Sequence, residues 1–268
     1  MTENQSAAAA FHALHRDFLI LPNAWDAASA RIIQDSGAQA IATSSAAVAW
    51  AHGYADGHHF PVEKLVTVVE EIARAVSIPI TTDAEGGYDD DVAKVAENVR
   101  KLIDAGAVGI NLEDSVKPHE LHLRKIEAAR AAAEKAGVDL FINARTDVYL
   151  KQLAPAEQAV EETLRRAAAI KAAGASGLFV PAIVAPDDIR AVAEGAGLPL
   201  NVMARPGLPN ATALKQLGVK RLSAATATFN AAMAALQEAT AAFVRDGDAE
   251  ALWSRRGNPP DYNNLFAG

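Results

Sequence analysis

Two carboxylates, Asp83 and Glu85, end a short β-branched run in the segment PITTDAEGGY, residues 79–88. Side chains in a strand alternate between its faces, so residues two apart project from the same side. Two adjacent carboxylates repel each other unless they share a proton or a cation. Gly86 and Gly87 follow at once, so both acids lie where the chain turns. This spacing predicts either a cation site or a polar strand end paired with lysines, and spacing alone does not separate the two.

Further oxygen donors and one arginine follow other strand-like runs. Asp56 lies in the polar loop after the second run, Glu113 ends the fourth, and Arg145 lies near the end of the fifth. Mg²⁺ takes one or two carboxylates directly and keeps several waters, so some of these acids would act through water. Arg145 could hold a substrate carboxylate with both arms of its guanidinium, or pair with an acid of the fourth run. A cation and an arginine across one pocket would suit a small 2-oxo acid, because the cation stabilises the enolate formed beside the carbonyl.

Other polar residues have simpler interpretations. Asp114 faces away from its neighbour Glu113 in a strand, so one of the two is expected to be solvated or to cap a helix. His52, His58 and His59 are expected to be loop residues, because their spacing matches no zinc pattern. Lys151, Arg165 and Arg166 fit ordinary solvated helix faces, and Ser44-Ser45 lack the G-x-S-x-G turn of a serine nucleophile.

Composition narrows the class of protein. The 268 residues include 33 acidic and 25 basic side chains, a formal net charge of −8, and no cysteine. The acidic balance argues against nucleic acid as a partner, and the lack of cysteine removes disulfides and thiolate chemistry. The N-terminus lacks the pattern of a signal peptide, and no apolar run reaches the length of a membrane helix. We expect a soluble, cytoplasmic protein without membrane contact.

Strand-like and helical segments alternate along the chain. Strands are predicted at 18–25, 40–50, 79–85, 108–114, 139–147, 177–183, 198–204 and 220–226. Helices are predicted at 6–15, 26–37, 61–76, 90–106, up to 136, 154–174, 186–194, 211–217 and 228–247. Eight such units predict an α/β fold, a (β/α)₈ barrel of the TIM type, forming one domain over residues 1–268. An open doubly wound sheet would carry a glycine-rich turn after its first strand, and none is present. The tail, 247–268, is rich in Pro and Asn and is expected to pack outside the barrel or on another subunit.

The segments LPNAWDAASARI, ATSSAAVAWAHGYAD, TTDAEGGY, INLEDS and INARTD together resemble the isocitrate lyase/phosphoenolpyruvate mutase superfamily. The resemblance runs from about Leu19 to the last predicted strand, with the motifs in the order of the family. It implies a (β/α)₈ barrel with Mg²⁺ at the strand ends, Mn²⁺ being an alternative. It also implies a last helix exchanged between subunits in a homodimer or homotetramer.

The same resemblance implies a role for individual residues. Asp83, Glu85, Glu113 and Asp56 match the family's metal-binding acids, with Asp56 acting through water. The segment that holds the substrate carboxylate and carbonyl corresponds to Ser44, Ser45 and Ala46. Arg145 matches the arginine that clamps the substrate, and Asn201 the asparagine at the distal end of larger substrates. Arg145, Ser44 and Glu113 are therefore the expected catalytic residues.

The loop after the fourth strand departs from the family. The lyases carry a K-K/R-C-G-H loop whose cysteine is the catalytic acid, and here the region reads EDSVKPHELHLRKIEAAR. Cleavage of isocitrate or 2-methylisocitrate by that mechanism is therefore not expected. Of the mutases' gating loop only Lys117-Pro118 is loosely similar, and Lys117, His119 and His122 are the titratable candidates that remain. FVPAI and NVMARPG also lack the glutamate, threonine and serine of the lyase site.

The residues and the resemblance together predict a Mg²⁺-dependent enzyme acting on a small 2-oxo acid or related carboxylate. The reaction would break or form a C–C or C–P bond beside an enolate, as a lyase, hydrolase or phosphonomutase. The alternative is a non-catalytic barrel that binds a metal and a carboxylate. The missing loop residues favour this alternative, and the complete set of acids argues against it.

Overall fold

A ring of parallel strands forms the centre of the protein. The computed structural model describes residues 2–257 and 260–266. The strands are β1 (Leu19–Leu21), β2 (Asn23–Ala24), β3 (Ile41–Thr43), β4 (Ile80–Asp83), β5 (Gly109–Glu113), β6 (Phe141–Arg145), β7 (Gly177–Phe179), β8 (Leu200–Met203) and β9 (Arg221–Ser223). They pair in the order β1-β9-β8-β7-β6-β5-β4-β3-β2, all parallel. The predicted (β/α)₈ barrel is confirmed.

The barrel closes through the first predicted strand, which is split in two at Pro22. Its first half, β1, pairs with β9, and its second half, β2, pairs with β3. Proline has no amide hydrogen to donate to a ladder, so it interrupts the pairing at this position. Its carbonyl still accepts a hydrogen bond from the amide of Ala42, 3.1 Å away. One continuous run therefore serves both ends of the sheet, which accounts for nine strands in eight units.

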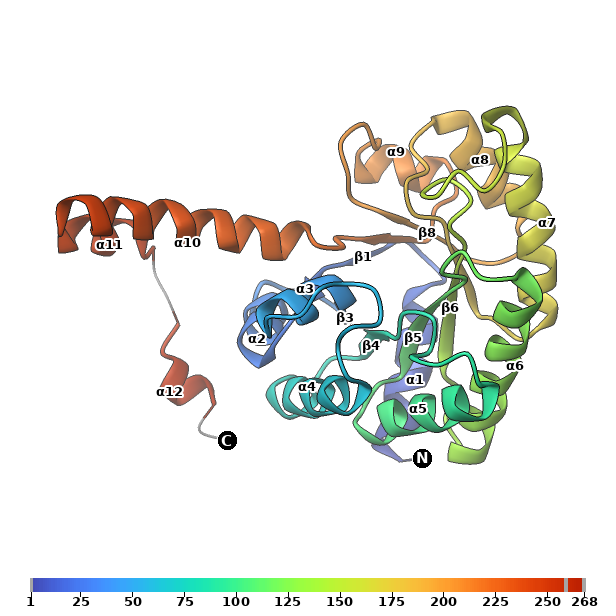
Figure 1. Ribbon diagram of the computed structural model, residues 1–268, viewed down its shortest axis with the longest axis horizontal. Helices are drawn as coiled ribbons and strands as arrows, with labels where there is room; N and C mark the ends of the chain where they lie inside the picture. The colour runs from blue at the N-terminus through green and yellow to red at the C-terminus, as the bar shows by residue number, and fades with distance from the viewer. Residues whose placement is uncertain (1, 258–259, 267–268) are drawn as a thin grey trace.

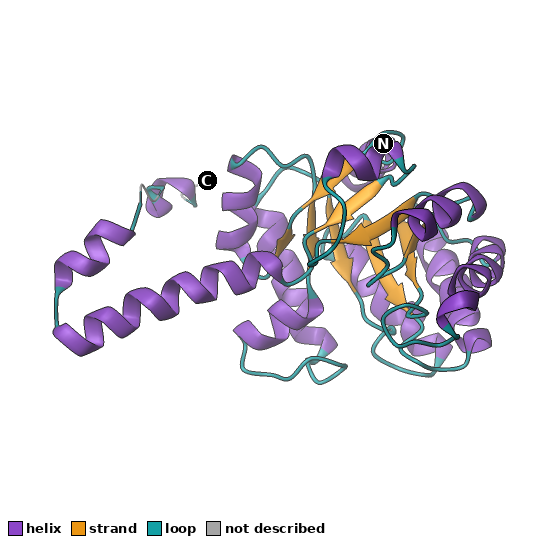
Figure 2. Cartoon of the chain, turned by 90° about the horizontal axis from the view of Figure 1, so that it is seen from above, coloured by secondary structure: helices purple, strands orange, loops and turns teal. Residues whose placement is uncertain are grey.

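Helices surround the strands as an outer layer (Figures 1 and 2). They are α1 (Glu3–Leu14), α2 (Ala27–Asp35), α3 (Ser45–Ala51), α4 (Val62–Ala75), α5 (Val92–Asp104), α6 (His119–Ala136), α7 (Ala159–Ala172), α8 (Pro186–Gly195) and α9 (Ala211–Gln216), with a 3₁₀ turn, η1, at Ala156–Gln158. Helix α4 shows how they attach, since its apolar residues recur at i, i+3, i+4 and i+7. These are Leu65, Val68, Val69 and Ile72, and all four are buried.

Helix α1 packs at the amino ends of the strands. Phe11 is fully buried and meets Phe141, the first residue of β6, edge to face at 5.5 Å, while His15 stacks on the same ring at 3.9 Å. Glycine begins two strands here because a side chain would not fit. A Cβ on Gly109 would lie 2.8 Å from Phe11, and one on Gly177 would lie 2.8 Å from Phe141. The aromatic residues therefore fill this end of the barrel and leave the opposite end for polar side chains.

Helix α3 corrects one prediction. Residues 40–50 were expected to be strand-like at first, but the strand covers only Ile41–Thr43 and the small residues after it form a helix. The Ser44 hydroxyl accepts a hydrogen bond from the amide of Ala47 and so caps the helix. Alanine is the best helix former and serine a preferred cap, so the local sequence favours this turn.

The C-terminal segment leaves the barrel. Helix α10 (Ala227–Asp246) projects away from it, and α11 (Ala249–Arg255) and α12 (Tyr262–Leu265) follow (Figures 1 and 2). Phe229 is the one residue assigned as buried in α10, and it packs against Trp25 at 5.1 Å and Trp50 at 5.8 Å. The described part of the tail, residues 247–257 and 260–266, contains α11 and α12 and no strand of the sheet. Residues 258–259 and 267–268 lie outside the described part, and the single domain over 1–268 stays a prediction. Among the described helices, none has both the length and the apolar character that crossing a bilayer requires.

Candidate active site

Polar side chains gather at the carboxyl ends of β4, β5 and β6, three neighbouring strands. Glu113 ends β5 and Arg145 ends β6, and the two residues are direct partners in the sheet register. Asp83 ends β4 and lies opposite Asn111 of β5. Parallel pairing brings the carboxyl ends of neighbouring strands to the same rim. The predicted acids of the third and fourth strands and the arginine of the fifth therefore lie on one rim.

Ser45 holds the Asp83 carboxylate in place. The amide and hydroxyl of Ser45 donate to Oδ2 of Asp83 over 3.1 and 2.8 Å. The backbone amide of Asp83 donates to the hydroxyl of Thr43, 2.9 Å away. Ser44 and Ala46, the other members of the predicted substrate segment, are buried in the same turn. The predicted substrate segment therefore lies in direct contact with Asp83, the first of the acids predicted to bind a metal.

Glu85 is buried just beyond the end of β4, with only 3% of its surface exposed. Its φ is +47°, in the left-handed region, where a residue with a side chain carries strain of about 1–2 kcal/mol. Burial first, and then the negative charge of Asp83, raise the pKa of Glu85 to about 7. A cation placed between the two carboxylates would favour the charged form of Glu85.

His58 contacts Glu85, a pairing that no pattern in the sequence predicted. Its backbone amide donates to Oε2 of Glu85, and its ring Nδ1 lies 3.3 Å from the same oxygen. The amide of Gly86 donates to the other ring nitrogen, Nε2, over 3.0 Å. An acceptor nitrogen carries no proton, so the ring proton lies on Nδ1 and points at Glu85. His58 does lie in a loop, as expected, but the loop folds over the acids.

Glu113 and Arg145 form an ion pair. Nη1 of Arg145 lies 2.5 Å from Oε2 of Glu113, and the hydroxyl of Ser115 donates to the other carboxylate oxygen over 2.6 Å. Asp147 accepts from Nε and Nη2 of Arg145 at 2.7 and 3.1 Å, a two-armed contact. Burial raises the pKa of Glu113 and Arg145 lowers it. In this arrangement Arg145 is the partner of a strand acid, one of the two roles the sequence left open.

Asp114 and Arg166 correct two further predictions. Asp114 is only 2% exposed, and the side chain of Glu113 is 15% exposed, so neither of the two is a solvent-facing acid. Arg166 does not lie on a solvated helix face, because its Nη1 reaches Oδ2 of Asp114 over 2.9 Å with 13% of its side chain exposed. Its neighbour Arg165 is 61% exposed, as expected. The apolar pattern of α7 gave no sign that one of two adjacent arginines points inward.

The remaining predicted site residues, Asp56 and Asn201, lie apart from this group. Asp56 is exposed on the loop between α3 and α4, and its charge contributes to the raised pKa of Glu85. Asn201 is buried in the barrel, where its amide nitrogen donates to Ser223 at 3.2 Å and its oxygen accepts from Asn143 at 2.9 Å. The roles that the resemblance implies for both residues stay predictions.

An arginine that the sequence did not single out lies inside the barrel. Arg221 of β9 is 1% exposed, and its Nη2 donates to Oδ1 of Asn111 over 3.2 Å. Its Nε and Nη1 have no hydrogen-bond partner among the residues that the structure describes. Burial lowers the pKa of Arg221 to about 9, and the charge of Asp83 raises it. A positive charge thus lies inside the barrel and interacts with the acid at the rim.

The loop after β5 lines a small cavity of about 300 Å³ beside the acids. Lys117 and Lys125 both lie there, and their ammonium groups contact Asp90 at 2.8 and 3.1 Å. His119 and His122 of α6 are buried, and burial lowers the pKa of both rings. Lys117 alone of the three titratable candidates lines the cavity.

The carboxylate oxygens at the rim are of the type that binds a hard cation such as Mg²⁺. Asp83, Glu85 and Glu113 are carboxylates, and Asp83 raises the pKa of the other two, a repulsion that a divalent cation would offset. Within residues 2–257 and 260–266, no three acidic or histidine side chains already converge in the geometry of a metal site. Each of the three acids instead faces a protein donor: Ser45, His58 or Arg145.

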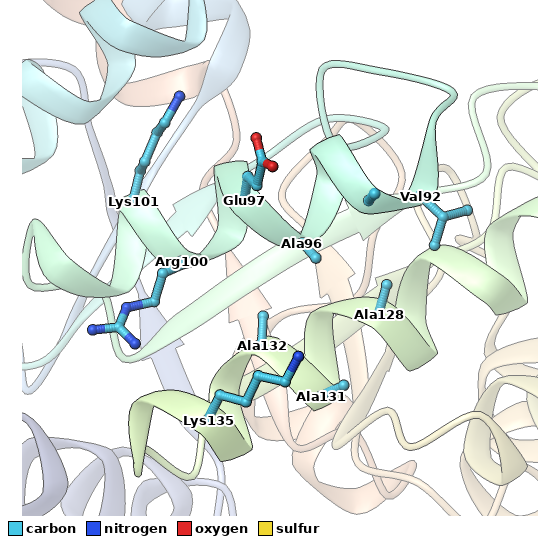
Figure 3. Close-up of a pocket in the computed structure, with 10 residues that line it drawn as sticks. Val92, Ala96, Glu97, Arg100, Lys101, Ala128, Ala131, Ala132 and Lys135 are labelled. Carbon is cyan, nitrogen blue, oxygen red and sulfur yellow. The ribbon is translucent and has the colours of Figure 1, made fainter.

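A larger groove of about 740 Å³ lies elsewhere, between α5 and α6 on the outer surface (Figure 3). Alanines such as Ala96 and Ala132 line its floor, with Glu97, Arg100 and Lys135 along its sides. None of the predicted site residues lines it. This outer groove is therefore separate from the polar residues predicted to form the active site.

A parallel (β/α)₈ barrel with three acids and an arginine on adjoining strand ends is what the resemblance to the isocitrate lyase/phosphoenolpyruvate mutase superfamily implied, and relatives of the chain belong to that superfamily. Within it, the chain belongs to the phosphoenolpyruvate phosphomutase family, whose family model matches residues 11–244. This confirms the resemblance found in the sequence.

Relatives of the chain fall within the same superfamily. An uncharacterized protein of Mycobacterium tuberculosis is 33% identical over 241 residues, which cover 89% of this chain and 90% of that protein. A Burkholderia cenocepacia protein proposed to be a phosphonomutase is 43% identical in its crystal structure, with a TM-score of 0.84, covering 90% of this chain and 100% of that one. The structure of a 2,3-dimethylmalate lyase is 26% identical, with a TM-score of 0.84, covering 100% of this chain and 95% of that one. These relatives support an enzyme and leave its reaction open.

Proposed function

We propose that the protein is a Mg²⁺-dependent enzyme that acts on a small 2-oxo acid or a related carboxylate through an enolate-type intermediate. The observation that carries the proposal is the grouping of Asp83, Glu85 and Glu113 beside Arg145 on one rim of the barrel. When bound, Mg²⁺, or Mn²⁺ in its place, supplies the positive charge that stabilises a developing negative charge on the keto oxygen.

In this proposal Asp83, Glu85 and Glu113 hold the cation, directly or through water, and Asp56 contributes through water. Arg145 binds the substrate carboxylate. Asp147 already holds Nε and Nη2 of Arg145, so the guanidinium keeps its orientation if Glu113 turns toward the cation. The Nη1 that now contacts Glu113 would then be free to donate to the substrate. Glu113 would then bind the cation instead of Arg145, and the substrate carboxylate would replace Glu113 as the partner of Arg145.

Ser44, Ser45 and Ala46 form the other wall of the proposed substrate site. They begin α3 beside Asp83, and amides at a helix start can donate to a carboxylate or carbonyl oxygen. Asn201 would reach the distal end of a larger substrate only if it released part of its buried hydrogen bonds. A small substrate therefore fits this proposal better than a large one.

Both carbon–carbon and carbon–phosphorus chemistry fit the rim. Relatives include a 2-methylisocitrate lyase of Escherichia coli and a carboxyvinyl-carboxyphosphonate phosphorylmutase of Arabidopsis thaliana, 30% and 32% identical. The chain has no cysteine, which argues against the acid catalysis by cysteine that we expect of isocitrate and methylisocitrate lyases. We propose a lyase, hydrolase or phosphonomutase that uses a different proton donor or needs none.

A non-catalytic barrel that binds a metal and a carboxylate is the second candidate. It is favoured by the ion pairs of Arg145, because every ion pair that its guanidinium makes with the described residues goes to Glu113 or Asp147. Turnover separates the two candidates. The purified protein with Mg²⁺ is assayed against a panel of 2-oxo acids, substituted malates and phosphonopyruvate, with phosphorus NMR following the last. Product formation identifies an enzyme, and binding without product identifies the non-catalytic barrel.

Calorimetry with Mg²⁺ and oxalate, a mimic of the enolate, tests the site itself. We expect oxalate to bind only when Mg²⁺ is present, and Asp83→Ala to abolish that binding while the far-UV spectrum stays unchanged. Absence of metal-dependent oxalate binding in the unmodified protein would refute the proposed function.

We also propose that the chain forms a homodimer or homotetramer through α10. The helix exposes apolar side chains, among them Leu236 at 58% and Val244 at 76%. Exposed apolar surface of this kind marks an interaction site. Light scattering after size exclusion should give a mass above one chain, and Leu236→Glu with Val244→Glu should reduce it to that of a monomer. A monomeric unmodified protein would refute this assembly.

A further inference from the structure

We infer that Arg166 of α7 is a positioning residue for Arg145, acting through Asp114 and Asp147. The inference rests on the proposed function, because it takes Arg145 as the group that binds the substrate carboxylate. Arg166 does not contact Arg145 itself. It belongs to a chain of buried contacts that ends at the guanidinium of Arg145.

The first link is between Arg166 and Asp114. Nη1 of Arg166 lies 2.9 Å from Oδ2 of Asp114, whose side chain is fully buried. The same oxygen accepts from the hydroxyl of Thr146 at 2.8 Å. Asp114 also accepts from the backbone amide of Asp147, over 3.2 Å to its nearer oxygen. Asp114 therefore fixes the two residues that follow Arg145 in the chain.

The second link is between Asp147 and Arg145. Both oxygens of Asp147 accept from the guanidinium, at 2.7 Å from Nε and 3.1 Å from Nη2. This two-armed contact fixes the plane of the guanidinium as well as its position. The backbone amide of Asp114 also donates to the carbonyl of Arg145 at 3.2 Å. The strand end and the side chain of Arg145 are thus held from the same place.

Charge explains why an arginine is needed at position 166. Asp114 and Asp147 both carry buried carboxylates, and the backbone amide of Asp147 donates to the carboxylate of Asp114. A buried charge without a partner is costly. Without Arg166, Asp114 would lack its cationic partner, and Arg145 is the next cation along the network. Because Arg166 neutralises Asp114, Arg145 stays paired with Asp147 and keeps its guanidinium at the rim, where the proposed substrate binds.

The neighbouring Arg165 offers a matched control. Both arginines donate to Glu162, Arg165 through Nε at 2.7 Å and Arg166 through Nε at 2.6 Å. Only Arg166 reaches Asp114, with 13% of its side chain exposed against 61% for Arg165. Replacing either removes one arginine from the same turn and one partner from Glu162. The two replacements differ in the contact with Asp114.

Calorimetry on Arg166→Met, Arg165→Met and the unmodified protein tests the inference. Mg²⁺ is titrated first, and oxalate is then titrated at saturating Mg²⁺. We expect Arg166→Met to weaken oxalate binding by about 10- to 100-fold, the usual loss when a residue supporting a binding group is removed. Arg165→Met should bind oxalate as the unmodified protein does. Mg²⁺ affinity should change less than oxalate affinity in both, because Asp83 and Glu85 lie outside this network and Glu113, the third proposed cation-binding acid, contacts it only through Arg145.

Two further variants cover the case in which Arg166→Met does not fold. Arg166→Lys keeps the charge without the forked donor, and Thr146→Val removes one hydrogen bond to Asp114 at nearly constant shape. Each should weaken oxalate binding, by less than the methionine variant. Oxalate affinity unchanged in the folded variants would overturn the inference, and so would an equal loss in Arg165→Met or an equal loss of Mg²⁺ affinity. If the unmodified protein binds no oxalate, the proposed function fails first and the inference fails with it.

Discussion

Glu85→Gln should stabilise the metal-free protein at alkaline pH. Glu85 is 3% exposed and has Asp83 beside it, and burial followed by that charge raises its pKa to about 7, against an ordinary value of 4.5. Glutamine has nearly the same shape and cannot ionise. Its side-chain oxygen can still accept the backbone amide of His58, so the main hydrogen bond is kept.

The size and sign of the effect follow from the two pKa values. Between pH 4.5 and 7 the folded protein keeps a proton on Glu85 that the unfolded chain has released. The free energy of unfolding therefore falls as pH rises through this window and levels off above it. Each unit of pKa difference between the folded and unfolded states corresponds to about 1.4 kcal/mol, so the full cost of ionising Glu85 in the folded protein is about 3 kcal/mol. The variant avoids this cost, and we expect it to be about 2–3 kcal/mol more stable at pH 8 and about 1 kcal/mol more stable at pH 5.

Urea unfolding in the presence of EDTA, followed by circular dichroism at pH 5 and pH 8, measures this difference. Glu97→Gln, on the exposed face of α5, is the matched control and should show no pH-dependent gain. Saturating Mg²⁺ at pH 8 should remove the advantage of Glu85→Gln, because a cation that binds only the folded form stabilises the unmodified protein. If the two proteins have the same stability at pH 8 without metal, Glu85 is not held in the environment described above.

Three further predictions concern the rim and the barrel interior. Asp83→Asn should remove the rise in melting temperature that Mg²⁺ gives the unmodified protein, as measured by scanning calorimetry; a rise of the same size would exclude Asp83 as a ligand. Arg221→Met should leave the free energy of unfolding unchanged or raise it by about 1–2 kcal/mol, since none of the described residues forms an ion pair with the buried guanidinium; a loss above about 2 kcal/mol in urea would show that this charge stabilises the fold. Gly87→Ala should lower the free energy of unfolding by about 2–4 kcal/mol, because φ is +87° and the new Cβ would lie 2.8 Å from both methyl groups of Val95; urea unfolding with no measurable loss would contradict this packing.

Local patterns were enough to predict the barrel and the rim. The alternation of strand-like and helical segments requires parallel pairing, and parallel pairing brings the strand ends together. Asp83, Glu113 and Arg145 could therefore be placed on one rim from the sequence. Helix α3 was missed because its alanines follow a strand without a break, although Ser44 is a recognisable cap. The split at Pro22 was missed because it matters only once the sheet closes.

The contacts among the polar residues could not be predicted in the same way. His58 reaches Glu85 across 27 positions of the chain, and Arg166 reaches Asp114 across 52. Arg165 and Arg166 are adjacent arginines on one helix, and only the packing of α7 against the strand ends decides which of them turns inward. The apolar periodicity of a helix cannot predict which arginine turns inward, because this depends on where the end of β5 places the carboxylate of Asp114.

The sequence by itself determined the fold, the family and the acids and arginine at the strand ends, since these depend on residue type, spacing and the direction of the chain. Tertiary structure alone decided the partners of those side chains: Ser45 for Asp83, His58 for Glu85, and Glu113 for Arg145. The physical reason is burial, because a charged group taken out of water binds whichever donor or acceptor the fold brings within reach.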